Sequence, residues 1–212
     1  SGALGFFGFM SFVKEGEPLS NLVWAVIGVA VAMVLAFIMT MVSYSDEEPK
    51  AKAEKKGVVS GDGPKVIVSP FQGEALPLSQ VEDEVFSGGM MGQGLAVNPT
   101  EGKAYSPCDG TISAIFPTGH AVGITGDNGV EVLIHIGMDT VKLEGKGFTK
   151  KVKEGDRVKT GDLLIEFDID LIKSEGYSVV SPVLISNTDQ FADVAPSASG
   201  NVKPGDELIV VM

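Results

Sequence analysis

The chain has 212 residues, with 28 acidic against 16 basic side chains and a formal net charge of −12 at pH 7. This acidic balance argues against a nucleic-acid partner, because neutralising phosphates requires a basic patch. Its single cysteine, Cys108, excludes a disulfide framework and a thiolate metal site, and is most simply a partly buried residue at a turn.

An uncharged segment of 28 residues runs from residue 18 to residue 45. Because a bilayer core requires about 20 apolar residues in a helix, residues 20–44 are predicted to form one transmembrane helix. A signal peptide is the competing interpretation, but no basic start or small-residue cleavage site is clear. Lysines at positions 50, 52, 55 and 56 follow the segment, whereas only Lys14 precedes it. This bias predicts that the C-terminal side is cytoplasmic.

Residues 1–45 read as the end of a larger membrane domain, since the chain opens with a short apolar, glycine-rich stretch and no initiator Met. An interfacial anchor is the alternative. Residues 46–65 change to acidic residues, alternating Lys and Ala, and then Gly and Ser, which is typical of a solvated linker. Residues 66–212 have the size of one ordinary domain.

This domain is predicted to be all-β, because short Val, Ile and Leu runs alternate with Gly, Pro, Asn and Asp. No long amphipathic helix is expected beyond residue 60, and the pattern allows short helical turns around residues 78–86 and 169–174. Residues 69–73 resemble 106–110, and residues 152–156 resemble 202–206. These repeats favour a sandwich or barrel of similar halves, although turns often reuse the same residues.

The only two histidines, His120 and His135, flank one predicted β-hairpin whose turn lies within residues 126–129. If Asp127 and Asn128 form a two-residue loop, the two histidines lie directly opposite each other. If the loop is Asn128 and Gly129, they are diagonal neighbours. Opposed residues have Cβ atoms about 4.5–5.5 Å apart and diagonal ones about 7–8 Å. Either register lets both imidazoles share one small ligand.

Two imidazoles suit phosphoryl acceptance better than zinc hydrolysis. A zinc site usually has three protein ligands, so Asp139, Cys108 or a partner would have to supply the third. A phosphoryl acceptor needs only a neutral imidazole and a second donor for the phosphate. A protonated imidazole lowers the pKa of its neighbour and keeps it neutral near pH 7. Two strand histidines without function are the simpler alternative, but their placement in one hairpin argues against it. No metal or other cofactor is expected.

Residues 129–141, GVEVLIHIGMDTV, resemble the active-site signature of the glucose-type IIA domain of the bacterial phosphoenolpyruvate:sugar phosphotransferase system. Residues 116–121, FPTGHA, resemble the second histidine segment of that family. The similarity continues through residues 69–70, 86, 107–112, 155–158 and 181–183, and so extends over residues 66–212. It implies an antiparallel β-sandwich, here preceded by the transmembrane helix.

The resemblance implies that His135 accepts a phosphoryl group from the phosphocarrier protein HPr and passes it to a IIB cysteine. His120 matches the histidine that binds the phosphate, and Thr118 matches the threonine that supports it. The apolar docking face would comprise Phe86, Met90, Met91, Phe116, Leu133 and Val141, with the acidic residues Asp83 and Asp139 near the arginine of HPr. Leu133 replaces a bulkier aromatic, and the two methionines replace branched aliphatic residues. These departures concern partner fit more than chemistry.

The membrane segment is then implied to be the last helix of a IIC sugar channel. The order of domains would be B, C, A, as in the β-glucoside and sucrose permeases, with the IIA domain on the cytoplasmic side of a bacterial cell membrane. No sugar follows from these residues, because none of them belongs to the sugar site.

Three rivals remain open. Residues 152–164 resemble a biotinyl or lipoyl carrier hairpin but lack the Met-Lys-Met of such carriers. A β-sandwich metallopeptidase of the lysostaphin kind would show His-x-His and further zinc ligands. A module of the same fold kept only for regulatory protein binding would have the same sequence.

Overall fold

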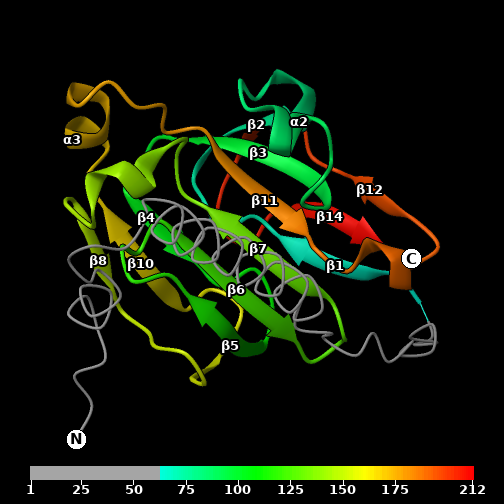
Figure 1. The fold of residues 1–212 in the computed structure, drawn as a ribbon. Helices are drawn as coiled ribbons and strands as arrows, with labels where there is room; N and C mark the ends of the chain where they lie inside the picture. Colours follow the sequence, from blue (N-terminus) through cyan, green and yellow to red (C-terminus); the bar gives the residue numbers. More distant parts are fainter. Residues whose placement is uncertain (1–62) are drawn as a thin grey trace, which may run out of the picture. The chain divides into compact units, whose positions relative to one another are not determined.

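The computed structural model describes residues 63–212, so the predicted transmembrane helix at 20–44 lies outside the described residues. Among residues 63–212, no helix is long and apolar enough to cross a membrane. The described chain consists of short strands and a few helical turns (Figure 1). The strands are β1 (Lys65–Val68), β2 (Gly73–Pro77), β3 (Gln93–Pro99), β4 (Lys103–Tyr105), β5 (Gly110–Ile115), β6 (Ala121–Gly126), β7 (Glu131–His135), β8 (Phe148–Lys150), β9 (Arg157–Val158), β10 (Leu163–Phe167), β11 (Ser181–Ile185), β12 (Val194–Pro196), β13 (Gly200–Val202) and β14 (Glu207–Val211).

The helical elements are short, as the sequence predicted. They are η3 (Leu78–Gln80), α2 (Glu84–Ser87), η4 (Thr140–Leu143), α3 (Ile169–Ser174) and η5 (Thr188–Gln190). The turns expected around residues 78–86 and 169–174 are therefore confirmed. Both α-helices begin at an aspartate, because Asp83 accepts the N–H of Val85 at 2.8 Å and Asp168 accepts that of Leu171 at 2.9 Å.

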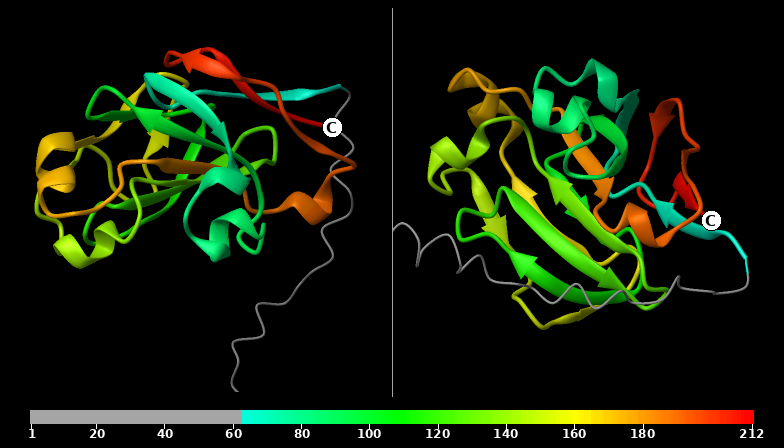
Figure 2. Two further views of the ribbon diagram at one scale, coloured as in Figure 1. Left: turned by 90° about the horizontal axis from the view of Figure 1, so that it is seen from above. Right: turned by 45° about the vertical axis from the view of Figure 1, so that its right-hand side comes forward.

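The strands form three sheets in the described residues. The large sheet has eight strands in the order β13-β2-β3-β11-β7-β6-β5-β9, and the small sheets have the orders β1-β14-β12 and β4-β10-β8. Every pairing is antiparallel. Figures 1 and 2 show β3, β11, β7 and β6 running across the molecule, with the two small sheets at its sides. The predicted all-β antiparallel fold is thus confirmed.

The main core lies among the three sheets, because each of them contributes fully buried side chains. These include Ile67 of β1, Ile134 of β7 and Ile165 of β10. Along β7 the exposure alternates, so that Val132 and Ile134 point into the core while Leu133 and His135 point to the other face. This alternation directs His135 away from the core.

A second apolar cluster covers the outer face of the large sheet. The segment that carries η3 and α2 supplies Val81 and Phe86, which pack on Ala96 of β3 and Leu184 of β11. Leu133 packs at the margin of this cluster. The cluster therefore brings α2 to the face on which His135 lies.

The sequence repeats correspond to shared turn chemistry. In segments 152–156 and 202–206, the aspartate accepts the backbone N–H of the lysine three residues earlier, Asp156 from Lys153 at 3.0 Å and Asp206 from Lys203 at 2.8 Å. The glycine before each aspartate has a positive φ. The repeats thus arise from two similar turns.

Candidate functional site

The β6–β7 hairpin has a register that differs from both predicted ones. Ala121 pairs with His135, and Val122 pairs with Ile134. The loop contains three residues, because the N–H of Gly126 donates to the carbonyl of Val130 at 2.8 Å. The two-residue loops predicted from the sequence are wrong, and the physical reason is Gly129, whose φ of 82° closes the longer loop.

The two histidine rings nevertheless lie together, with centroids 5.1 Å apart and planes at 72°. His120 precedes β6 and lies at the end of the turn formed by residues 116–120. In a regular strand, adjacent side chains alternate between faces, so His120 would lie opposite to its neighbour Ala121 and to the partner of that residue, His135. The pair therefore depends on the turn before β6 as well as on the hairpin.

One hydrogen bond fixes the proton of His135. The Nδ1 atom of this ring lies 2.7 Å from the carbonyl oxygen of Gly137. Because a carbonyl can only accept, Nδ1 carries the proton and donates, and Nε2 of the neutral ring retains its lone pair. Burial lowers the pKa of His135 and outweighs the Gly137 carbonyl, Asp83 and Asp139, which raise it. The ring is therefore neutral at pH 7, with Nε2 available as a nucleophile.

His120 is 6% exposed and is held by Thr118, whose Oγ1 lies 2.5 Å from Nδ1 of the ring. Burial, together with His135, lowers the pKa of His120 to about 4, so this ring is also neutral at pH 7. When the Thr118 hydroxyl donates to Nδ1, the ring proton lies on Nε2. In that tautomer His120 can donate a hydrogen bond to an anion.

Each histidine also packs against a phenylalanine. The ring of Phe86 lies 5.0 Å from that of His135, and the ring of Phe116 lies 5.2 Å from that of His120. The four rings form a row in the order Phe86, His135, His120, Phe116. Phe116 is 43% exposed, whereas Phe86 is only 8% exposed. The row is therefore covered at its Phe86 end and exposed at its Phe116 end, and His135 within it is partly exposed.

The comparisons with known proteins identify the family. Residues 65–191 match the family described as phosphoenolpyruvate-dependent sugar phosphotransferase system, EIIA 1. The chain belongs to this family. It is 34% identical to the solved structure of glucose permease IIA from Mycoplasma capricolum, over 70% of this chain and 96% of that one, with a TM-score of 0.65. The predicted family resemblance is confirmed, and the chain is a phosphotransferase component of the sugar phosphotransferase system.

Longer relatives contain the EIIA domain as one part. The chain is 42% identical over 189 residues to a protein of Bacillus subtilis, which covers 89% of this chain and 31% of the relative. It is 44% identical over 217 residues to a protein of Halalkalibacterium halodurans, which covers 98% of this chain and 34% of the relative. Both are named PTS system beta-glucoside-specific EIIBCA component. The chain spans about one third of the length of these curated relatives.

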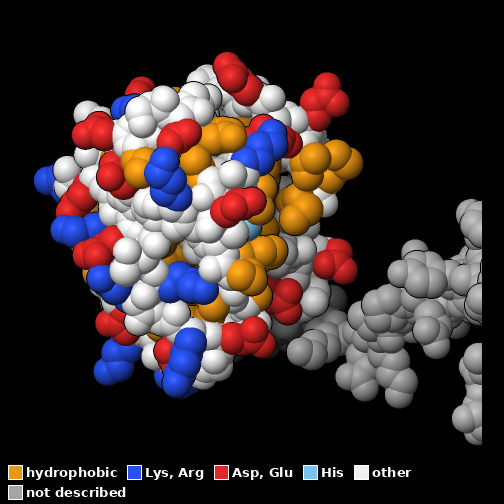
Figure 3. Space-filling view, turned by 60° about the vertical axis from the view of Figure 1, so that its left-hand side comes forward, with side chains coloured by type: hydrophobic (Ala, Val, Ile, Leu, Met, Phe, Trp, Pro, Cys, Tyr) orange, Lys and Arg blue, Asp and Glu red, His pale blue; other side chains and the backbone are white. Residues whose placement is uncertain are grey.

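The predicted docking residues of the EIIA domain differ in exposure. Met90, Met91, Phe116 and Val141 are exposed, and Met90 is 70% exposed. Phe86 and Leu133 are less exposed, because they pack in the second apolar cluster on the outer face of the large sheet. Figure 3 shows a pale-blue histidine surface bordered by orange hydrophobic side chains, with red acidic side chains nearby.

The two predicted acidic residues lie close enough to His135 to raise its pKa. Asp83 is the N-cap of α2, where its side chain accepts the N–H of Val85. Asp139 has a φ of 59° and its carboxylate lies 2.8 Å from Nζ of Lys142. Because this ion pair is exposed, it contributes little to stability. The Asp139 carboxylate can therefore exchange Lys142 for another cation at small cost.

No role was predicted from the sequence for the groups that hydrogen-bond His135 and the turn after it. Gly137 supplies the carbonyl, and Thr140 and Ser181 bond the backbone around it. Gly137 has a φ of 70°, and a Cβ there would lie 2.6 Å from the Ser178 carbonyl oxygen. The signal in the sequence was a glycine two residues after a strand histidine, a position where only a residue without Cβ fits.

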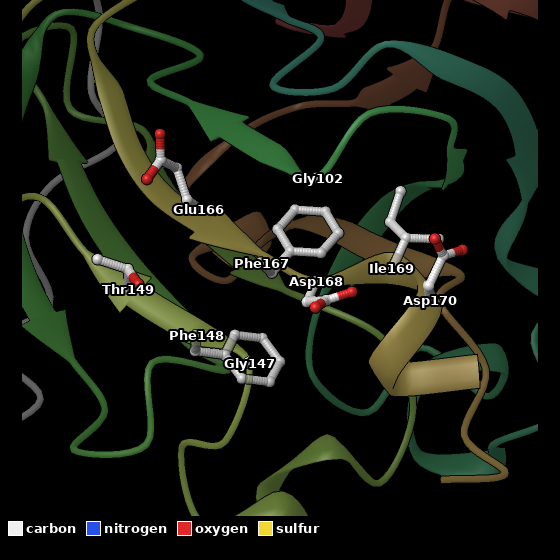
Figure 4. Close-up of a pocket in the computed structure, with 9 residues that line it drawn as sticks. All are labelled: Gly102, Gly147, Phe148, Thr149, Glu166, Phe167, Asp168, Ile169 and Asp170. Carbon is white, nitrogen blue, oxygen red and sulfur yellow. The ribbon is translucent and has the colours of Figure 1, made fainter. Parts of the chain in front are cut away.

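The described residues of the EIIA domain also carry a separate hollow of about 560 Å³. Figure 4 shows its lining, which comes from β8, β10 and the start of α3 and includes Phe148, Phe167 and Asp168. Neither histidine lines this hollow.

Within residues 63–212, no three His, Cys, Asp or Glu side chains are grouped as metal ligands. Burial, aided by Asp109 and Asp127, raises the pKa of Cys108 to about 11.

Proposed function

We propose that this EIIA domain accepts a phosphoryl group from HPr on Nε2 of His135 and passes it to a IIB cysteine. The hydrogen bond from Nδ1 to the Gly137 carbonyl carries this proposal, because it leaves the lone pair on Nε2. The lone pair forms the new bond to phosphorus while the bond between phosphorus and the donor breaks. In the second step a cysteine thiolate forms the bond to phosphorus, and the electron pair returns to Nε2.

His120 would stabilise the phosphoryl group during both steps. Its ring lies 5.1 Å from that of His135, and Thr118 supports the tautomer that donates from Nε2. A phosphoryl group on His135 adds negative charge beside His120, which favours its protonated form. A preorganised donor of this kind is typically worth about 2.7 to 4 kcal/mol in the transition state.

The exposed apolar residues around the pair would form the docking surface for both partners. Met90, Met91, Phe116 and Val141 can exclude water from the reacting atoms during a brief encounter. Asp83 and Asp139 would face the basic side chains of HPr and steer its approach. The acidic balance of the chain agrees with a basic partner.

The whole protein would be a sugar permease with the domain order B, C, A. The relatives named EIIBCA support IIB and IIC domains in the same polypeptide, and their names suggest a β-glucoside as the sugar. Residues 20–44 would be the last transmembrane helix of IIC, and residues 46–65 the linker to the IIA domain, residues 66–212. This order would place the IIA domain on the cytoplasmic side of a bacterial cell membrane.

The direct test is incubation of the chain with phosphorylated HPr, followed by detection of phosphate that is labile in acid and stable in base. The wild type should be labelled, and His135→Ala should not, although it should fold, because a partly exposed strand position tolerates truncation within about 1 kcal/mol. Labelling of His135→Ala at the wild-type rate would refute the nucleophile assignment. A zinc hydrolase is not favoured, because the chain belongs to the EIIA family.

Substitution of the two histidines should impair different steps of the phosphoryl transfer. Glutamine at position 120 can donate one hydrogen bond but cannot become positively charged. We therefore expect His120→Gln to accept phosphate from HPr but to pass it to the IIB cysteine about 100-fold more slowly. Rapid-quench measurement of both half-reactions checks this expectation. Onward transfer at the wild-type rate would mean that His120 takes no part in it.

A further inference from the structure

Ser181, the first residue of β11, bonds the turn that follows β7. It is fully buried, its Oγ accepts the N–H of Gly137 at 3.1 Å, and its hydroxyl donates to the carbonyl of Val179 at 2.8 Å. Two other buried serines also precede a proline, Ser69 and Ser106, but each donates to the carbonyl two residues later in its own segment. Of these three serines, only Ser181 has a side chain that bonds a distant segment of the chain.

The reason for this contact lies in the strand pairing. The pairing of β7 with β11 ends at Ile134 and Val183. Continued register would place Pro182 opposite His135, and proline has no N–H to donate. The chain turns away at Gly137, whose φ is 70°. The Ser181 hydroxyl supplies the acceptor that the buried N–H of Gly137 would otherwise lack.

The two peptide groups on either side of Gly137 are fixed by the Ser181 hydrogen bond and by two further hydrogen bonds. The peptide between Ile136 and Gly137 is held at its N–H by Ser181 and at its carbonyl by Thr140, whose Oγ1 donates at 2.5 Å. The next peptide is held at its N–H, because Met138 donates to the carbonyl of Ser178 at 2.9 Å. Its remaining group is the Gly137 carbonyl, which lies 2.7 Å from Nδ1 of His135. The direction of this carbonyl is therefore set by residues outside the strand.

We propose that Ser181 is a positioning residue for phosphoryl acceptance: by bonding the Gly137 N–H it keeps the Gly137 carbonyl on Nδ1 of His135, and thereby keeps the lone pair on Nε2. The proposal rests on the proposed function only for its effect on rate. Its effect on the tautomer of His135 is independent of any partner. When one nitrogen of a neutral imidazole carries the proton, the other nitrogen must carry the lone pair.

The test uses Ser181→Ala in the full 212-residue chain, with Ser106→Ala as the matched control. Ser106 is also a buried serine before a proline, and its hydroxyl donates to the carbonyl of Cys108. Cys108 lies near Gly126, at the opposite end of β6 from His120. Because the chain has only two histidines, histidine-selective ¹⁵N labelling gives two ring systems. His120→Gln assigns them, and long-range ¹H–¹⁵N spectra report which nitrogen of His135 carries the proton.

Ser181→Ala should reduce the population of the Nδ1–H tautomer of His135 and slow phosphate acceptance at saturating HPr about three- to ten-fold, as expected for the loss of one buried hydrogen bond. Ser181→Thr, which keeps the hydroxyl, should leave both the tautomer population and the rate of phosphate acceptance near the wild-type values. Ser106→Ala should change neither, although it lowers the melting temperature. If Ser181→Ala does not fold, Ser181→Cys replaces the oxygen by a weaker acceptor of similar size and should shift both readouts in the same direction.

The outcomes separate the two proposals. If Ser181→Ala or Ser181→Cys leaves the His135 tautomer at the wild-type ratio, Ser181 is merely structural and the inference is wrong. If the wild type itself accepts no phosphate, the proposed function is wrong, and the tautomer ratio alone then decides the role of Ser181. If the tautomer shifts while the wild type and the variant are labelled at the same rate, the claim of positioning for phosphoryl acceptance is refuted.

Discussion

Acid should destabilise the domain through His120. Burial and the neighbouring His135 lower the pKa of His120 from 6.5 to about 4, so the folded chain resists protonation at this ring. The unfolded chain, with the ordinary pKa, takes up the proton as the pH falls below 6.5. A group whose pKa is depressed by folding contributes its full stability above pH 6.5 and loses it as the pH falls toward 4.

The size of the effect follows from these two pKa values. Between pH 7 and pH 5, the unfolded state becomes almost fully protonated at residue 120 while the folded state stays largely neutral. At about 1.36 kcal/mol for each pKa unit, the free energy of unfolding should fall by about 2 kcal/mol over this interval. By pH 4 the loss should approach its limit of about 3 kcal/mol. His135 should add to the loss, since its pKa is also lowered.

Urea denaturation of a fragment with residues 58–212 at several pH values measures this dependence. Carboxylates also contribute to acid denaturation, so the wild type is compared with His120→Gln, which lacks the titrating ring but retains every carboxylate. The wild type should lose about 2 kcal/mol more than the variant between pH 7 and pH 5. Agreement of the two pH profiles within about 0.5 kcal/mol would show that His120 titrates normally in the folded domain and would refute this reasoning.

Three other changes test the support of the site, its surface and the domain boundary. Gly137→Ala should destabilise the domain by more than about 2 kcal/mol and slow phosphate acceptance, because its Cβ would clash with Ser178 and Thr140. Gly155→Ala, also at positive φ but with open space around the Cβ, should cost about 1 kcal/mol; equal losses in urea denaturation would contradict the clash. Met90→Ser should raise the KM for HPr about ten-fold, whereas Met212→Ser, also at an exposed methionine, should not; the same KM in both variants would place docking elsewhere. Deletion of residues 1–57 should leave a domain with a cooperative thermal transition that still accepts phosphate, and an aggregated fragment would show that the boundary is wrong.

The meeting of the two histidines could be predicted from sequence, but not the geometry that produces it. The residues between Gly126 and Gly129 are compatible with loops of two or three residues, because Gly and Asn both tolerate positive φ. A change of one residue in loop length shifts the register and exchanges the faces of one strand. The pair survives this change only because His120 lies in the turn before β6, where strand alternation does not apply. Periodicity carries no information about such a turn.

The residues that hydrogen-bond the backbone around His135 were less predictable than the histidines themselves. His120, His135 and Thr118 carry recognisable chemistry, whereas Ser181 contributes a hydrogen bond to a backbone group 44 residues away. Such a contact depends on where β7 and β11 separate, and this is a property of the sheet. Phe86 shows a related limit, since the family resemblance implied a place on the docking face, but the η3–α2 segment buries it against His135.

The unequal exposure of the two phenylalanines gives the row of four rings a direction. A partner that meets the row from the covered Phe86 end would first have to displace α2, whereas the Phe116 end is already accessible. The attacking ring needs no passage along the row, because His135 is itself partly exposed whereas His120 is 6% exposed. Under the proposed function, HPr and the IIB domain would both have to reach Nε2 of this one ring. The two partners would therefore compete for the same opening, and the two half-reactions would alternate.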